Sequence, residues 1–281
     1  MSPSWLEQWR PRRLLSSITL ALYPDRIVWL RTRRGLNIQV EDKGILEIAT
    51  ANGAWQPVLE SLPQALSQAG AGGLSARVLI SNHFMRYAIV PNPDGATSRA
   101  ERQSLCRYAF ERVHGAAVAD WELQLSLAAV GGSALASALD RELTQMLRLH
   151  LKSAGASLVS VQPYLMAAYN QSASPAGDGI FALAEPQRLC LLAWQSGSWV
   201  AVQQQRAGAD WPVLLQSHVS RLRMQFELPA DTPVQVCALE SASTASLLAG
   251  SHHTLVKPGL PARLQSAIGN DYFGAALVLS V

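Results

Sequence analysis

The sequence contains few of the residues and motifs on which active sites and metal centres are built. Its 281 residues include three cysteines, which lie far apart without a Cys-x-x-Cys spacing: Cys106, Cys190 and Cys237. Such cysteines are typical of buried free thiols in a reducing compartment. The chain has no HExxH, GxSxG, GxxxxGK or GxGxxG motif, and its six histidines do not have the spacing of a metal-ligand set. We therefore predict no catalytic residue and no metal site.

Charged residues and long hydrophobic runs are also scarce. Charged side chains make up 15% of the chain and hydrophobic ones 49%, which is typical of a globular protein with a large core. The one uncharged stretch of membrane-like length, Leu123 to Leu139, contains Gly131 and Gly132, so we interpret it as a strand, a turn and a helix start. The net charge of +3 is too small to indicate nucleic-acid binding, and no secretory signal is visible. These features predict a cytoplasmic protein.

Seven of the 23 basic residues gather near the N-terminus, within or just after an amphipathic lead-in over residues 1–16. They are Arg10, Arg12, Arg13, Arg26, Arg31, Arg33 and Arg34. Together with Trp5 and Trp9 they could face an anionic membrane surface, a phosphate or an acidic partner. Alternatively, they belong to a solvated strand edge, where positive charge discourages edge-to-edge pairing. Peripheral membrane binding through this segment is therefore one of the open alternatives.

An internal duplication gives the strongest indication of architecture. The segment from Ser17 to Val40 aligns with Gly179 to Gln203, and the alignment matches Pro24 with Pro186, Arg26 with Arg188, Gly35 with Gly197 and Val40 with Val202. In both copies two apolar strands flank a turn that contains proline. A repeated unit of strand, turn and strand predicts a duplicated β-meander.

The remaining sequence alternates between helix and strand patterns. Helices are predicted over about 57–68, 137–153 and 163–170, with further helices beginning near Thr97 and after Asp210. Leu105, Ala109 and Val113 lie at helical spacing. The small and polar segment 171–179 is a predicted linker between a first lobe at 17–170, with an inserted subdomain at about 92–153, and a second lobe at 180–281. The predicted fold class is therefore α/β.

This arrangement resembles the two-lobed actin-like (ribonuclease H-like) ATPase fold, in which each lobe contains a β-meander and α/β units. In that family each meander turn carries a glycine-containing phosphate loop with an acidic residue. Here the two turns read Leu20 to Asp25 and Ala182 to Gln187, and neither contains glycine. A proline without an N–H group lies in each turn. We therefore expect that nucleotide hydrolysis is lost and that no cofactor is required, with weak ATP binding left as an open alternative.

Several segments of the chain resemble more specifically the PilM proteins of type IV pilus assembly and the cytoplasmic domain of the type II secretion protein GspL. These segments are LISNHFMRYAIVP at 79–91, ERQSLCRYAFERVHG at 101–115, WEL at 121–123, LDRELTQMLRLHLKSAG at 139–155, VQP at 161–163 and YFGAALVL at 272–279. The resemblance implies a non-enzymatic scaffold on the cytoplasmic face of the inner membrane. It also implies that the cytoplasmic tail of a PilN-like bitopic protein and other platform proteins are its partners.

The resemblance places the partner groove near the first meander and the strand at 79–87. The predicted partner contacts are therefore Arg31, Arg33, Asn82 and Arg86. An active actin-like ATPase or phosphotransferase with divergent phosphate loops is the alternative function.

Overall fold

The chain forms two compact units, each built around a five-stranded sheet with the same strand order. The computed structural model describes residues 16–34, 38–49, 53–91, 98–127, 132–172, 177–239, 253–256 and 271–277. Unit 1 comprises Met1–Ile80, Gln145–Gln162 and Leu260–Val281, and unit 2 comprises Ser81–Thr144 and Pro163–Gly259.

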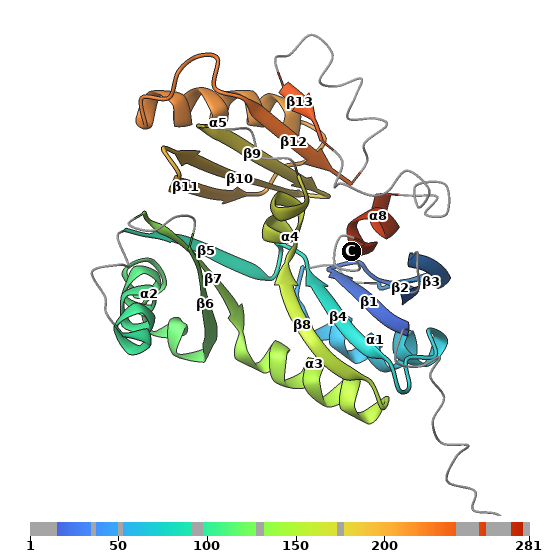
Figure 1. Ribbon diagram of the computed structural model, residues 1–281. Coiled ribbons are helices and arrows are strands. Elements are labelled where there is room, and N and C mark those ends of the chain that lie inside the picture. The colour runs from blue at the N-terminus through green and yellow to red at the C-terminus, as the bar shows by residue number, and fades with distance from the viewer. Residues whose placement is uncertain are drawn as a thin grey trace, which may run out of the picture. The chain divides into compact units, whose positions relative to one another are not determined.

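The sheet of unit 1 has the order β3-β2-β1-β4-β8 (Figure 1). Its strands are β1 (Ser16–Tyr23), β2 (Arg26–Arg34), β3 (Ile38–Glu47), β4 (Ser75–Ile80) and β8 (Ser157–Pro163). Strand β1 is antiparallel to β2 and parallel to β4, and its residues from Ile18 to Tyr23 are all buried. A continuous buried run is typical of a central strand that is covered on both faces.

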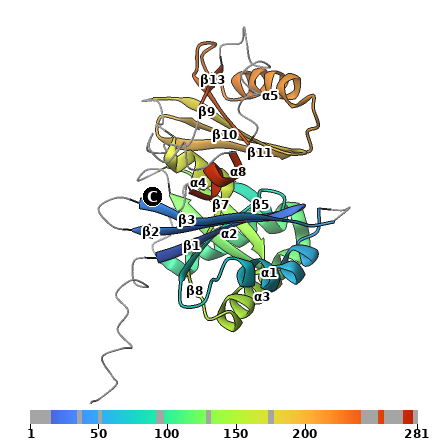
Figure 2. The same ribbon diagram turned by 90° about the vertical axis from the view of Figure 1, so that its right-hand side faces the viewer.

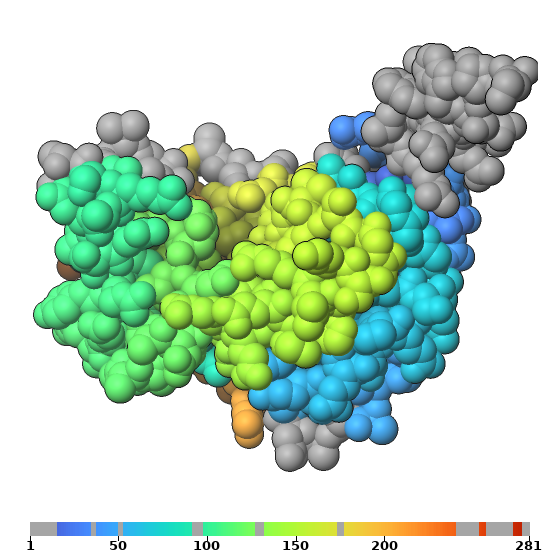
Figure 3. Space-filling view, turned by 90° about the horizontal axis from the view of Figure 1, so that it is seen from below, coloured from blue at the N-terminus to red at the C-terminus, as the bar shows by residue number. Residues whose placement is uncertain are grey.

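Helices cover both faces of this sheet. Helix α1 (Gln56–Gln68) and helix α3 (Arg141–Ser153), which continues into unit 1 from unit 2, lie on one face, and α8 (Asp271–Leu277) lies on the other (Figure 2). Figure 3 shows α1 and α3 side by side on the surface of unit 1. Beyond their ends, the Gly73 amide donates to the Gly155 carbonyl over 2.8 Å. On the opposite face, the Tyr272 ring of α8 meets Tyr23 edge-on at 5.2 Å between centroids.

The main sheet of unit 2 repeats this topology in the order β11-β10-β9-β12-β13 (Figure 1). Its strands are β9 (Gly179–Glu185), β10 (Arg188–Gln195), β11 (Ser198–Gln205), β12 (Val234–Ala238) and β13 (His253–Leu255). Helix α5 (Trp211–Gln225) packs Leu215, Val219 and Leu222 on one face of the sheet. Helix α4 (Tyr164–Gln171) covers the other face, where the Tyr169 ring lies 5.7 Å from Phe181 between centroids.

The strand registers confirm the predicted duplication. Tyr23 pairs with Arg26 in the first hairpin and Glu185 pairs with Arg188 in the second, so each turn has two central residues. In the second turn Gln187 has a φ of 59°, which with the preceding proline is the geometry of a type II turn. The predicted α/β fold class with its duplicated meander is confirmed.

Unit 2 also contains a three-stranded sheet with the order β5-β7-β6. Its strands are β5 (Met85–Val90), β6 (Trp121–Leu127) and β7 (Ala134–Asp140), and it is accompanied by α2 (Arg99–His114) and the short 3₁₀ helix η4 (Gly115–Asp120). Helix α2 begins with a capping box in which Ser98 and Glu101 bond each other's backbone amides. Cys106 and Phe110 of α2 pack on Val90 and Ala136 of the sheet. All three cysteines are buried free thiols, as predicted.

One local prediction is wrong. The helix predicted over 137–153 begins at Arg141, because Ala134–Asp140 is the central strand of the small sheet. Its short apolar residues are buried on both sides, and such a run does not distinguish a strand from a helix. The helical spacing of Leu105, Ala109 and Val113 is confirmed by α2, in which Leu105 is 38% and Val113 is 75% accessible.

The predicted lobe limits follow the sequence repeat, whereas the compact units divide the chain at other residues. Residues 81–144 belong to the unit of the second sheet, and residues 271–277 belong to the unit of the first. The lobe limits therefore stay a prediction. Residues 1–15 of the lead-in and Gly35 lie outside the described residues.

Candidate functional site

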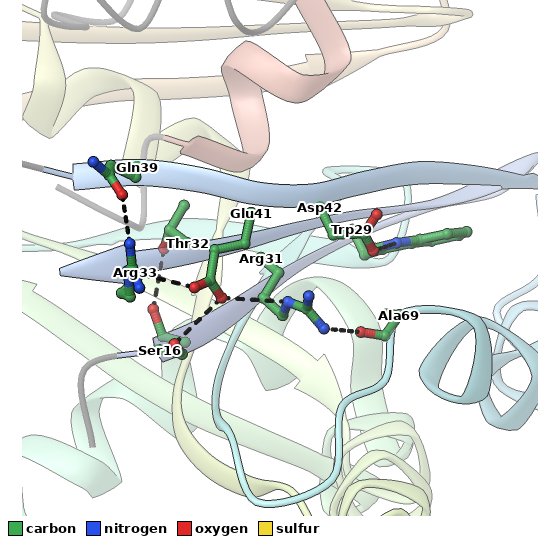
Figure 4. A network of polar contacts seen from close by, with 10 residues as sticks. Ser16, Trp29, Arg31, Thr32, Arg33, Gln39, Glu41, Asp42 and Ala69 are labelled. Atoms are coloured by element: carbon green, nitrogen blue, oxygen red, sulfur yellow. Dashed lines mark hydrogen bonds and ion pairs between the residues drawn. The ribbon is translucent and has the colours of Figure 1, made fainter. Parts of the chain in front are cut away.

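Two of the predicted partner contacts, Arg31 and Arg33, share one carboxylate on the neighbouring strand (Figure 4). The Nε atoms of both arginines lie 3.5 Å from oxygens of Glu41. Arg31 pairs with Asp42 and Thr32 pairs with Val40, which leaves Glu41 as the extra residue of a β-bulge. Because a bulge re-aims side chains locally, it directs Glu41 toward both guanidinium groups.

The outer atoms of these arginines contact neutral acceptors. An Nη atom of Arg33 donates to the Gln39 side chain over 2.8 Å, and one of Arg31 donates to the Ala69 carbonyl over 3.4 Å. The Arg31 side chain remains 32% exposed and the Arg33 side chain 43%. Half-exposed ion pairs of this kind stabilise a fold by about 0–1 kcal/mol. The network therefore orients two cations, with a net positive charge, at the surface of unit 1.

Asn82 lies in the interior of unit 2 and is 0% exposed. Its Nδ2 donates to a Glu185 oxygen over 2.6 Å, and its Oδ1 accepts from the Tyr87 hydroxyl over 2.7 Å. The Leu165 amide also donates to Oδ1, over 3.3 Å. A side chain with this many internal partners has a structural role, so we no longer count Asn82 among the partner contacts.

Glu185, at the end of β9, is the centre of this buried polar cluster. One carboxylate oxygen accepts from the Ser81 hydroxyl over 2.7 Å, and the other accepts from the backbone amide and the side-chain amide of Asn82. Burial raises the pKa of Glu185, and the three donors and the nearby charge of Arg188 only partly offset it. The carboxylate thus satisfies a buried backbone amide and two buried side-chain donors.

The neighbouring turn is fixed by further contacts. A ring nitrogen of His83 lies 2.8 Å from the Pro186 carbonyl oxygen, and the Gln204 side chain donates to the Asn82 carbonyl over 3.1 Å. The sequence showed Glu185 only as an acidic residue in a turn. One signal for its role was that a glutamate directly follows a wholly apolar strand, because a buried carboxylate requires partners. The identity of those partners was not visible in the sequence.

The raised pKa of Glu185 predicts a dependence of stability on pH. Between the ordinary pKa of a glutamate and the raised value, the folded protein still binds a proton that the unfolded chain has released. The contribution of Glu185 to stability is therefore fully present below the ordinary pKa and is lost as pH rises through the raised one. We expect the free energy of unfolding of wild type, relative to Glu185→Gln, to fall as pH rises above about 4, the ordinary pKa of a glutamate. Urea unfolding of both proteins across this range measures the difference, and parallel curves would contradict it.

Arg86, on β5, is the predicted contact with the fewest acidic neighbours. It is exposed, and its guanidinium donates to the Met85 carbonyl over 2.8 Å. Burial and the positive charge of Arg188 lower the pKa of Arg86. In the described part of unit 2, the Nε atom of Arg188 has no hydrogen-bond partner. Arg86 and Arg188 are thus two like charges close to each other in unit 2, whereas Arg31 and Arg33 belong to unit 1.

The acidic residue of the first turn is also engaged within its own unit. Asp25 accepts two hydrogen bonds from the Arg26 guanidinium, over 3.1 and 2.6 Å. Arg26 in turn lies 4.5 Å above the Tyr272 ring of α8 and 3.4 Å from Glu47. The hydrogen bond to Asp25 is the main reason why the pKa of Arg26 is raised. Asp25 therefore orients the Arg26 guanidinium over the Tyr272 ring, and this cation–π contact holds α8 on the sheet.

Among the residues that the structure describes, no group of three histidine, cysteine, aspartate or glutamate side chains has the geometry of a metal site. Within the same residues, no helix is long and apolar enough to cross a bilayer.

The sequence matches no known protein family and no curated protein sequence. Solved structures with a similar fold do exist. A chain of the PilM–PilN type IV pilus biogenesis complex is 13% identical with a TM-score of 0.61, and the match covers 94% of this chain and 98% of that one. A protein of unknown function with an actin-like ATPase fold from Bacteroides thetaiotaomicron is 8% identical with a TM-score of 0.59, covering 95% and 98%.

The third structure is the cytoplasmic domain of EpsL, an inner-membrane component of the type II secretion system of Vibrio cholerae. It is 20% identical with a TM-score of 0.54, and the match covers 80% of this chain and 82% of that domain. The predicted resemblance to pilus and secretion proteins is thus confirmed at the level of the fold. The chain has the actin-like ATPase fold, and its structural neighbours include the PilM–PilN complex and the EpsL cytoplasmic domain.

Proposed function

We propose that this chain is a non-enzymatic scaffold in an inner-membrane assembly platform of the pilus or secretion type. In this role it binds the cytoplasmic tail of a bitopic, PilN-like membrane protein at the cytoplasmic face of the membrane. The likeness to a chain of the PilM–PilN complex, over nearly the full length of both chains, is the observation that carries the proposal.

The two meander turns support the loss of nucleotide hydrolysis. Phosphate loops need backbone amides that can approach the ligand and an acidic group that can reach its metal ion. Here each turn has a proline in place of glycine, Asp25 is paired with Arg26, and Glu185 is buried among donors. Neither carboxylate is available without breaking contacts inside its own unit.

The exposed arginines support the binding of an acidic or anionic partner segment. Arg31, Arg33 and Arg86 remain proposed contacts, because each guanidinium is held by backbone or side-chain acceptors and still reaches solvent. A charged group that is oriented before binding loses less conformational entropy when the partner arrives.

Titration calorimetry with a synthetic peptide of the tail, and separately with Mg-ATP, tests the function. We expect the tail of a PilN-like protein from the same genome to bind with a micromolar or lower dissociation constant. We expect Mg-ATP to produce no binding heat and no phosphate release. Charge reversal of Arg31 and Arg33 should weaken tail binding several-fold, mainly at low salt. Arg34→Glu, on the same strand, is the control for the change in net charge. ATP turnover by the wild type would contradict the scaffold proposal.

A further inference from the structure

An open apolar groove lies within unit 2, between α2 and the strands β5 and β11. Its volume is about 620 Å³, and its lining includes Ile89, Pro91, Leu105, Tyr108, Val200 and Phe226. Strands β5 and β11 are edge strands of two different sheets, since the sheet orders place β5 beside β7 alone and β11 beside β10 alone. Figure 1 shows α2, β5 and β11 close together in this unit.

The α2 side of the groove exposes several large apolar side chains. Of the seven exposed large apolar side chains in the described residues, three belong to α2 and line the groove: Leu105, Tyr108 and Val113 at 38%, 61% and 75%. Their spacing places them along one flank of the helix, beside the face that packs on the small sheet. Exposed apolar side chains gathered along one groove are typical of an interaction site.

The charge of the lining limits what can bind. Arg112 is the one charged residue among the lining residues, and it forms no ion pair with any described carboxylate. Gln203 and Gln225 add neutral polar groups to the lining. An apolar ligand that carries an acidic group would cover the exposed side chains and pair with Arg112, whereas a basic ligand would meet an uncompensated positive charge.

The openness of the groove favours a peptide over a small molecule. Small-molecule sites enclose most of the ligand surface. Tyr108 and Val113 remain mostly exposed here, so they would leave a small ligand partly in solvent. A peptide segment can bury several exposed side chains at once.

We propose that this groove binds an apolar peptide segment with an acidic residue, supplied by the cytoplasmic tail of the membrane partner. The inference rests on the proposed function and gives the tail a binding surface other than the predicted arginine contacts. Arg86 directly precedes Tyr87, which lines the groove.

Fluorescence anisotropy with the labelled tail peptide tests the inference on the full chain. Tyr108→Glu should weaken binding by about tenfold or more, because it places a negative charge on the apolar wall where the acidic peptide lies. Leu149→Glu is the matched control: Leu149 is 54% exposed on α3 and is not part of the groove. Exchanging the acidic residue of the peptide for lysine should weaken binding to wild type and restore binding to Arg112→Glu.

The outcomes separate the two proposals. Wild-type binding that Tyr108→Glu leaves unchanged would overturn the groove but keep the scaffold. The absence of any tail binding to wild type would overturn both. If sedimentation shows a dimer that Tyr108→Glu dissociates, the groove is an interface between two copies, and the partner assignment is wrong.

Discussion

Glu185→Ala is expected to lower the free energy of unfolding of unit 2 by about 3–5 kcal/mol. The substitution removes the acceptor for the Ser81 hydroxyl and for both amide groups of Asn82, all of which are buried. Each buried donor that is left without a partner costs about 1–3 kcal/mol. The loss is far larger than that expected for any exposed ion pair of the chain.

Urea unfolding followed by tryptophan fluorescence measures this loss, because Trp194 and Trp199 lie in the same unit. Glu185→Gln should cost clearly less than Glu185→Ala, since the amide oxygen can still accept and the Ser81 hydroxyl can rotate to accept from the new NH₂ group. Glu47→Ala serves as the control on an exposed strand end, where little change is expected. Equal stabilities of Glu185→Ala and wild type would show that the cluster does not hold this region.

Gly179→Ala should destabilise unit 2 by roughly 3 kcal/mol, although alanine is the smallest possible addition. Gly179 pairs with Trp194 across β9 and β10, and an added Cβ would overlap the indole ring. The ring cannot move easily, because its Nε1 donates to the Gly177 carbonyl over 2.8 Å and Tyr169 packs against it at 5.4 Å between centroids. Trp194 itself is 5% exposed.

A double-mutant cycle tests this cause directly. In a Trp194→Leu background the smaller side chain leaves room, so the additional cost of Gly179→Ala should largely disappear. Gly208→Ala is the control for replacing glycine as such, since its added methyl would meet only the Asp210 carboxylate at 3.4 Å. Additive losses in the cycle would exclude the overlap with Trp194 as the cause.

Local patterns predicted much of the architecture. The matched prolines at 24 and 186 and the apolar strands on either side predicted two hairpins, and the registers confirm both. Helix α1 and the capping box of α2 also follow from residues close together in the chain. The strand Ala134–Asp140 was missed, because its burial comes from neighbours on both sides and not from its own periodicity.

The sequence by itself determined the α/β class, the duplicated meander and the absence of glycine from both turns, because turn chemistry and apolar periodicity act between neighbouring residues. Only the tertiary structure decided how the polar residues are used. Ser81 and Asn82 meet Glu185 across about a hundred positions of sequence, which buries a predicted partner contact inside unit 2. The groove of α2, β5 and β11 likewise depends on which strand edges the topology brings together, and no local pattern encodes that.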